Sequence, residues 1–172
     1  VRPCAFELQA LSSGPASDGM RSLCQDTSGT LWAVTQSGRL ARKDGWFGPA
    51  ANCVTAAPQG GVWVGTESGG LRWWRQGEVR AITQQDGLAS QSVTALLTTP
   101  SGDVWLGTLT SNAVQRLRDS QFQTFMLPQE YGHFVSLAVD ASGGVWAATV
   151  GGVLTRVRDK ALVDQTTHTL DE

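Results

Sequence analysis

The 172-residue chain has few of the residues that most often build metal, nucleophilic or redox sites: it contains two histidines, three cysteines and one tyrosine. It has no CxxC pair, and two histidines cannot supply the ligand set that a zinc site needs. No GxSxG, HExxH, P-loop or calcium-loop motif occurs. These absences predict a protein with no bound metal, no cofactor and no catalytic residues.

Long hydrophobic runs and blocks of like charge are also missing. No apolar run approaches the ~18 residues that cross a bilayer as a helix. The formal net charge is only -2, and acidic and basic residues are dispersed along the chain. We therefore expect neither membrane insertion nor a nucleic-acid partner. The cysteines, Cys4, Cys24 and Cys53, leave two alternatives open: buried free thiols, or one disulfide that includes Cys4.

One short phrase recurs four times along the chain. It reads SGTLWAVT at 28–35, GGVWVGT at 60–66, SGDVWLGT at 101–108 and SGGVWAAT at 142–149. Successive tryptophans are 31, 42 and 41 residues apart, and a threonine stands three positions after each. Self-similarity at such a period marks stacked or radially arranged supersecondary units. We expect these positions to build the scaffold: Trp32, Trp63, Trp105 and Trp146, with Thr35, Thr66, Thr108 and Thr149.

The third repeat indicates what each unit contains. Residues 92–100 are rich in β-branched and apolar side chains and end in a Pro-Ser-Gly-Asp turn, after which 104–108 form a short apolar strand. In residues 113–119 apolar and polar side chains alternate more clearly, and residues 120–127 are largely polar. Four antiparallel strands, apolar at one end of the sheet and polar at the other, are typical of a β-propeller blade.

The sequence thus predicts an all-β fold, a single β-propeller segment over residues 1–172 with about four four-stranded antiparallel meander blades, as part of a larger or dimeric ring. The blades are expected at about 20–52, 53–91, 92–133 and 134–172. Residues 1–19 are expected to form the outer strand of a preceding blade and its loop.

The first unit is shorter than the others. Leu40 and Val54 are 14 residues apart, against 25 in the same interval of the second unit. Residues 43–52 are therefore too few for a full fourth strand. Two outcomes stay open: the edge of the third strand is available to a partner strand, or Trp46 and Phe47 fold over that edge.

The stretch DGLASQSVTALLTTPSGDVWLGT at 86–108 resembles the two-component regulator propeller repeat, which combines a DGL lead-in, a turn and the tryptophan. The chain departs from the family pattern at the aspartate six residues before the tryptophan. It is present as Asp26 and Asp140 but replaced by Ala57 and Thr99.

The resemblance implies a sensor or recognition module of a bacterial signalling protein, because such repeats form the extracytoplasmic propellers of hybrid sensor kinases, which bind glycans or other small ligands. We therefore expect a periplasmic or extracellular location. The family builds its rings with more than four blades, so the expected partners are further propeller blades from a second copy or a longer parent chain. A closed four-bladed monomer is the alternative.

Ligand contacts are expected on the face formed by the loops that enter each innermost strand and those that join the second and third strands. The residues with polar or aromatic tips there are Glu67, Gln85, Asp86, Gln91, Glu130, Tyr131 and His133. Trp73 and Trp74 can form a stacking platform for a sugar ring, or pack against a neighbouring blade.

Our interpretation is a non-catalytic recognition module that binds a glycan, another small ligand or a protein partner. The alternative is a structural subunit that uses its blade edges to hold a complex together. An enzyme similar to the propeller lyases is the third hypothesis. It is disfavoured because His133 and His168 fall at different strand positions.

Overall fold

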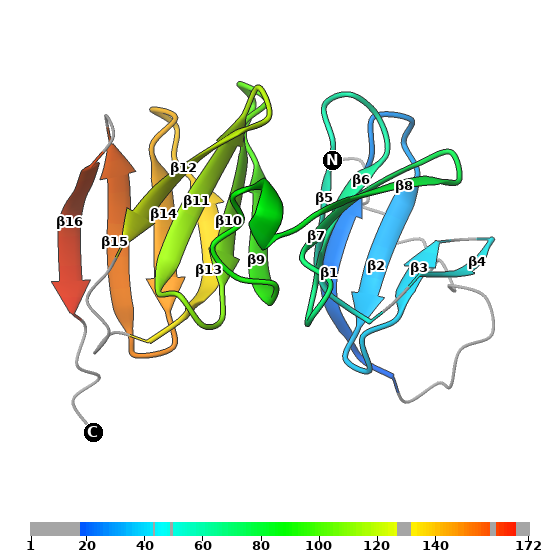
Figure 1. Cartoon of the computed structure of the whole chain (residues 1–172), viewed down its shortest axis with the longest axis horizontal. Coiled ribbons are helices and arrows are strands. Elements are labelled where there is room, and N and C mark those ends of the chain that lie inside the picture. Colours follow the sequence, from blue (N-terminus) through cyan, green and yellow to red (C-terminus); the bar gives the residue numbers. More distant parts are fainter. Residues whose placement is uncertain (1–17, 43, 49, 127–131, 159–160, 168–172) are drawn as a thin grey trace, which may run out of the picture.

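The computed structural model describes residues 18–42, 44–48, 50–126, 132–158 and 161–167. Over these residues the chain forms four antiparallel sheets of four strands each, together with one 3₁₀ turn, η1 (Gln84–Asp86) (Figure 1). Within every sheet the strands neighbour one another in chain order, which is a meander. The predicted all-β architecture of four propeller blades is confirmed. In this part of the chain, no helix is long and apolar enough to cross a membrane.

The four blades follow the four repeats. Blade 1 contains β1 (Met20–Gln25), β2 (Leu31–Thr35), β3 (Leu40–Arg42) and β4 (Gly45–Phe47). Blade 2 contains β5 (Ala51–Ala56), β6 (Val62–Thr66), β7 (Leu71–Arg75) and β8 (Glu78–Ile82). Blade 3 contains β9 (Val93–Thr98), β10 (Val104–Thr108), β11 (Ala113–Arg118) and β12 (Gln121–Met126). Blade 4 contains β13 (Phe134–Val139), β14 (Val145–Thr149), β15 (Val153–Arg158) and β16 (Ala161–Thr167).

Blade 1 resolves the alternatives left open for the short first unit. The segment Gly45–Phe47 forms β4, which pairs with all three residues of β3. The alternative of an available β3 edge is therefore wrong, and the alternative in which Trp46 and Phe47 cover that edge is confirmed, since both residues belong to β4. The short interval shortens both strands to three residues instead of removing the fourth strand.

Each repeated tryptophan of the first three blades packs against the following blade. Trp32, Trp63 and Trp105 are 3%, 8% and 5% exposed. Trp105 shares a core with Phe134 and Val145 of blade 4. The equivalent cores pair Trp32 with Val54 and Val62 of blade 2, and Trp63 with Val104 and Leu106 of blade 3. The tryptophan face of each blade is thus the face that receives the next blade.

The glycine of the repeated GT pair allows this close packing. A Cβ on Gly107 would lie 2.6 Å from the Cβ of Phe134, a fully buried residue of β13. A Cβ on Gly65 would lie 2.7 Å from the Cγ1 of Val93 on β9 of blade 3. Contacts that short are not tolerated in a close-packed interior, so any side chain here would push the neighbouring strand away.

The repeated threonines close the loop between the second and third strands of their blades. All four are buried, with exposed fractions between 0% and 5%. The Thr66 hydroxyl donates to the carbonyl of Gly70 (2.9 Å) and accepts from the N–H of Gly69 (2.8 Å). The Thr149 hydroxyl accepts from the N–H of Val153 (3.2 Å). These side chains satisfy loop backbone groups that the ladder leaves unpaired.

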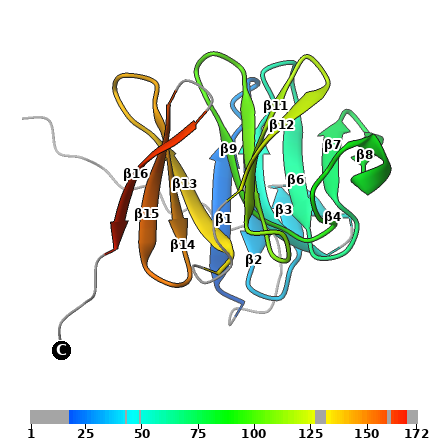
Figure 2. The ribbon, with the colours of Figure 1, turned by 60° about the vertical axis from the view of Figure 1, so that its left-hand side comes forward.

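The four blades form an open arc. Strand β1 packs against β5, β5 against β9 and β9 against β13, but among the described strands β1 and β13 make no comparable contact. Figure 2 shows β13–β16 at one end of the molecule with no further sheet beyond them. Trp146 lies on this terminal face and is partly exposed, unlike its three counterparts. At the other end, Leu23 of β1 is 65% exposed. The outer strand expected at 1–19 falls almost entirely outside the described residues.

Candidate functional site

Three grooves run between neighbouring blades, on the face that carries the turns joining the first and second strands. We name them groove 1–2, groove 2–3 and groove 3–4 after the blades that they separate. Their volumes are about 450, 720 and 670 Å³, respectively. Each is lined by the second-strand tryptophan of one blade and by the turn of the next: Trp32 with 58–61, Trp63 with 101–103, and Trp105 with 142–144.

In blade 4 the turn aspartate holds the tryptophan and an arginine together. The Asp140 carboxylate accepts from the Ser142 hydroxyl (2.6 Å), from the N–H groups of Ser142 (2.8 Å) and Gly144 (2.9 Å), and from the Trp146 indole (3.1 Å). Arg156, which stands opposite Trp146 on β15, forms an ion pair with the same carboxylate and lies over the indole ring at 5.6 Å. The Ser142 hydrogen bond is the largest of the causes that lower the pKa of Asp140.

Blade 1 repeats this arrangement with a second carboxylate. Asp26 accepts from the N–H groups of Ser28 (2.9 Å) and Thr30 (3.0 Å) and from the indole of Trp32 (2.8 Å). Arg42 lies over the Trp32 ring at 5.2 Å and forms an ion pair with Asp44. Partial burial acts to raise the pKa of Asp26, but the hydrogen bonds outweigh it and the pKa is lowered.

The lowered pKa of Asp140 leads to a pH prediction. A carboxyl whose pKa is lower in the folded protein stabilises the fold above its unfolded pKa, which is about 4, and loses this effect as the pH falls through the folded value. Asp140→Asn should therefore lower the free energy of unfolding at pH 7, and the difference from the unmodified protein should shrink below about pH 4. Urea denaturation of both proteins at a series of pH values measures this difference in the free energy of unfolding.

Glu67→Gln is the matched control for this prediction, because Glu67 is exposed and makes no hydrogen bond or ion pair among the described residues. It should leave the stability unchanged at every pH. A difference between the Asp140 variant and the unmodified protein that stays constant down to pH 2 would show that the charge of Asp140 is not what stabilises the turn.

Blades 2 and 3 lack the turn aspartate, with different consequences. In blade 2, Ala57 replaces it, and Trp73 stands opposite Trp63 where the other blades have arginine. The two rings stack at 6.0 Å, and the Trp73 indole donates to the carbonyl of Gly60 (3.0 Å). The Trp63 indole N–H is buried and finds no acceptor in the part of the chain that the structure describes. Trp74 packs on the opposite side of the sheet, towards blade 1, so Trp73 and Trp74 do not form one stacking platform.

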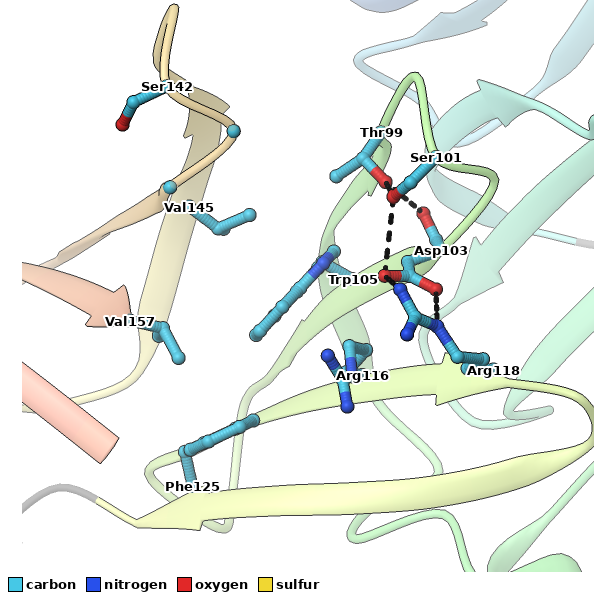
Figure 3. A pocket seen from close by; sticks show the side chains of 12 residues that line it. Thr99, Ser101, Asp103, Trp105, Arg116, Arg118, Phe125, Ser142, Val145 and Val157 are labelled. Carbon is cyan, nitrogen blue, oxygen red and sulfur yellow. Dashed lines mark hydrogen bonds and ion pairs between the residues drawn. The ribbon is translucent and has the colours of Figure 1, made fainter. Parts of the chain in front are cut away.

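In blade 3, Thr99 replaces the aspartate while the arginine is kept. Arg116 stands opposite Trp105, and its guanidinium lies over the indole ring at 5.8 Å. Figure 3 shows Arg116 projecting into groove 3–4 between Trp105 and Phe125. The rings of Trp105 and Phe125 stack at 5.5 Å, and Val145 and Val157 of blade 4 line the opposite wall.

The mouth of groove 3–4 is polar. Thr99 shares a hydrogen bond with Ser101 (2.8 Å). Asp103 forms a bidentate ion pair with Arg118, whose pKa is raised by the hydrogen bond to that carboxylate. Asp103 is only 5% exposed, so this pair fixes the turn between groove 2–3 and groove 3–4.

The structure does not gather the predicted ligand residues around a groove. Glu67 and Gln91 are exposed in loops, Gln85 is exposed in η1, and His133 is partly buried just before β13. Asp86 reaches groove 2–3, but its carboxylate also accepts from the backbone N–H of Thr83 (2.8 Å) and so caps η1. Glu130 and Tyr131 lie outside the described residues. The ligand role of these seven residues stays a prediction.

The sequence reasoning did not select Arg116, Asp103 or Arg118. The sequence does contain a sign of the role of Arg116. Thr99 replaces the turn aspartate of the repeat, while a basic residue is kept on the third strand. Eleven positions separate Trp105 and Arg116, against ten between Trp146 and Arg156, and the register of β10 with β11 shows that the two pairs are equivalent.

The described residues offer no metal centre and no activated thiol. No group of three or more histidine, cysteine, aspartate or glutamate side chains comes together in this part of the chain. Cys24 and Cys53 are free thiols, and burial raises the pKa of each to about 12. A thiol with so high a pKa is not a nucleophile near neutral pH. Cys4 lies outside the described residues.

These features define a β-propeller segment, and a sequence comparison identifies its repeat. The family model described as two component regulator propeller matches residues 87–110, which include the tryptophan of the third repeat, and this match confirms the predicted resemblance. No curated protein matches the chain in sequence.

Solved structures with the same fold include a lyase and extracellular sensor domains. Virginiamycin B lyase from Staphylococcus aureus is 14% identical, with a TM-score of 0.73 over 89% of this chain and 57% of the lyase. Two extracellular domains assigned to hybrid two-component systems of B. thetaiotaomicron are 21% and 17% identical. Both have TM-scores of 0.67, over 81% and 92% of this chain and 22% and 24% of those domains. The chain thus spans little more than half of the lyase and under a quarter of the sensor domains.

Proposed function

We propose that the chain is a non-catalytic recognition module of a bacterial signalling protein, located in the periplasm or outside the cell, which binds a ligand or a protein partner. The observation that carries this proposal is the two component regulator propeller repeat at 87–110. The similarity to extracellular domains of hybrid two-component systems supports it.

An enzyme of the lyase type is the alternative that the similar structures raise. A variant of that lyase in which a histidine is replaced by alanine is catalytically inactive. In the described part of this chain, His133 is the one histidine, and no group of acidic and histidine side chains surrounds it. This environment supports a binding function over catalysis, because general acid–base chemistry needs several positioned groups.

Further propeller blades are the partners that the open arc supports. In blades 1–3 the tryptophan face always receives the next blade, and Trp146 presents the same face with no described strand against it. Such blades come from a longer parent chain or from a second copy. A structural role, in which the terminal faces hold a complex together, rests on the same observation.

The proposed function is tested by ligand-induced thermal stabilisation of the purified chain against a panel of oligosaccharides. A ligand that binds only the folded state raises the melting temperature, and the rise should be lost in Glu67→Ala or His133→Ala if the predicted loop face binds it. The same protein is incubated with quinupristin and examined by mass spectrometry. No stabilisation by any panel member, together with cleavage of quinupristin, would overturn the proposal in favour of a lyase.

A further inference from the structure

Groove 3–4 differs from the blade 4 arrangement in having an arginine without a carboxylate. Arg116 corresponds to Arg156, which is paired with Asp140. Within the described residues Arg116 makes no ion pair, and its guanidinium donates only to the neutral side chain of Gln123 (2.7 Å). Its Nε–H is buried and has no acceptor among the described residues, as is also true of Arg156. An arginine in this state retains strong donors suited to a carboxylate.

The other donors that hold the Asp140 carboxylate are also repeated in blade 3. The turn of residues 99–103 has the same backbone hydrogen bonds as the turn of residues 140–144. The indole N–H of Trp105, which corresponds to that of Trp146, has no hydrogen bond to any described residue. Blade 3 therefore presents the same kinds of donors that hold the Asp140 carboxylate in blade 4. Because residue 99 is a threonine, it supplies no carboxylate to these donors.

The charges that line groove 3–4 favour an anion. They belong to Asp103, Arg116 and Arg118, and the first and last of these neutralise each other in their ion pair. Arg116 thus leaves the groove with a net positive charge. Beside it, the lining of the groove includes Trp105, Phe125, Val145 and Val157, and an apolar wall of this kind suits a ring in the ligand.

We propose that groove 3–4 binds a small ligand in which a carboxylate is attached to a ring. The carboxylate accepts hydrogen bonds from the Arg116 guanidinium and the Trp105 indole, and the ring lies in the groove against its apolar lining. The inference rests on the proposed recognition function and adds to it a ligand class and a place on the fold.

The test is an NMR titration of the ¹⁵N-labelled chain with benzoate and with benzamide, its neutral analogue of the same shape. The indole N–H signal of Trp105, assigned with Trp105→Phe, should shift on addition of benzoate and stay unchanged with benzamide. Arg116→Gln should weaken benzoate binding by about tenfold or more, since a hydrogen bond to a charged group contributes about 1.5–3 kcal/mol. Arg116→Met, which keeps the apolar stem, should do the same.

Thr99→Asp is the sharpest variant, because it restores the aspartate of blades 1 and 4. Its own carboxylate should pair with Arg116, shift the Trp105 indole signal without ligand and abolish benzoate binding. Arg42→Gln is the matched control at the same position of blade 1, where the arginine is paired with Asp44, and it should bind benzoate as the unmodified protein does.

Three outcomes would overturn the inference: equal shifts with benzamide, unchanged benzoate binding in Thr99→Asp, or binding of inorganic phosphate as tight as that of benzoate, which would indicate a site for any anion. The proposed function fails separately. If one of these three outcomes is found while an oligosaccharide still stabilises the unmodified chain, the recognition function stands and only the carboxylate site is rejected.

Discussion

Replacement of Trp105 by alanine is expected to lower the free energy of unfolding by about 3–5 kcal/mol. The side chain is 5% exposed, stacks on Phe125 and packs against Phe134 and Val145 of blade 4. Its removal takes away the centre of the core that joins blades 3 and 4. Urea denaturation followed by circular dichroism measures the loss.

Trp146→Ala is the control for this experiment, because Trp146 holds the same repeat position on the terminal face of the arc. Its loss should be clearly smaller in a monomer, where no further blade covers the ring. An equal loss would mean that another copy covers this face in solution. Light scattering on the unmodified chain then decides, since a mass of twice 18.3 kDa should fall to the monomer value in Trp146→Glu.

The second large effect is expected for Gly107→Val. Its Cβ would lie 2.6 Å from the Cβ of Phe134, and both residues belong to strands held by backbone ladders, so β13 must move away from β10. Overpacking of a core typically costs about 1–3 kcal/mol, and we expect the upper end of this range. Amide hydrogen exchange in β13 should accelerate together with the fall in stability.

Ala148→Val places the same side chain at the equivalent position of blade 4. No described strand packs on that face, so the free energy of unfolding and the exchange of β15 amides should stay close to those of the unmodified chain. If Gly107→Val were as stable as Ala148→Val, the close approach of blades 3 and 4 would not depend on the glycine.

The blades were predictable because their signal is local and repeated. The second strand of each blade is marked by a glycine turn, a tryptophan and a threonine that recur at a similar spacing. The polarity of the flanking segments then indicates which of them form the inner and outer strands. The β4 strand was missed because residue counting assumed strands of equal length, whereas β3 and β4 adapt to the short interval with three residues each.

The candidate groove was not predictable to the same degree. It depends on which third-strand residue stands opposite each tryptophan, and a one-residue difference in loop length hides the equivalence of Arg116 and Arg156. The sequence reasoning also looked for ligand contacts among the polar side chains of loops, whereas Arg116 lies within a strand, β11. Only the strand register places Arg116 opposite Trp105 and over its ring.

The two ends of the arc are different surfaces, and this restricts how copies of the chain can associate through them. Blade 4 ends in a tryptophan face, whereas blade 1 ends in the face that carries Leu23. Contacts between unlike surfaces are heterologous, so after each addition the assembly still has one free surface of each kind. Such growth stops only if the rotation per blade closes a ring, and otherwise continues as a helical filament. The angle between neighbouring blades therefore decides whether self-association produces a discrete particle or a fibre.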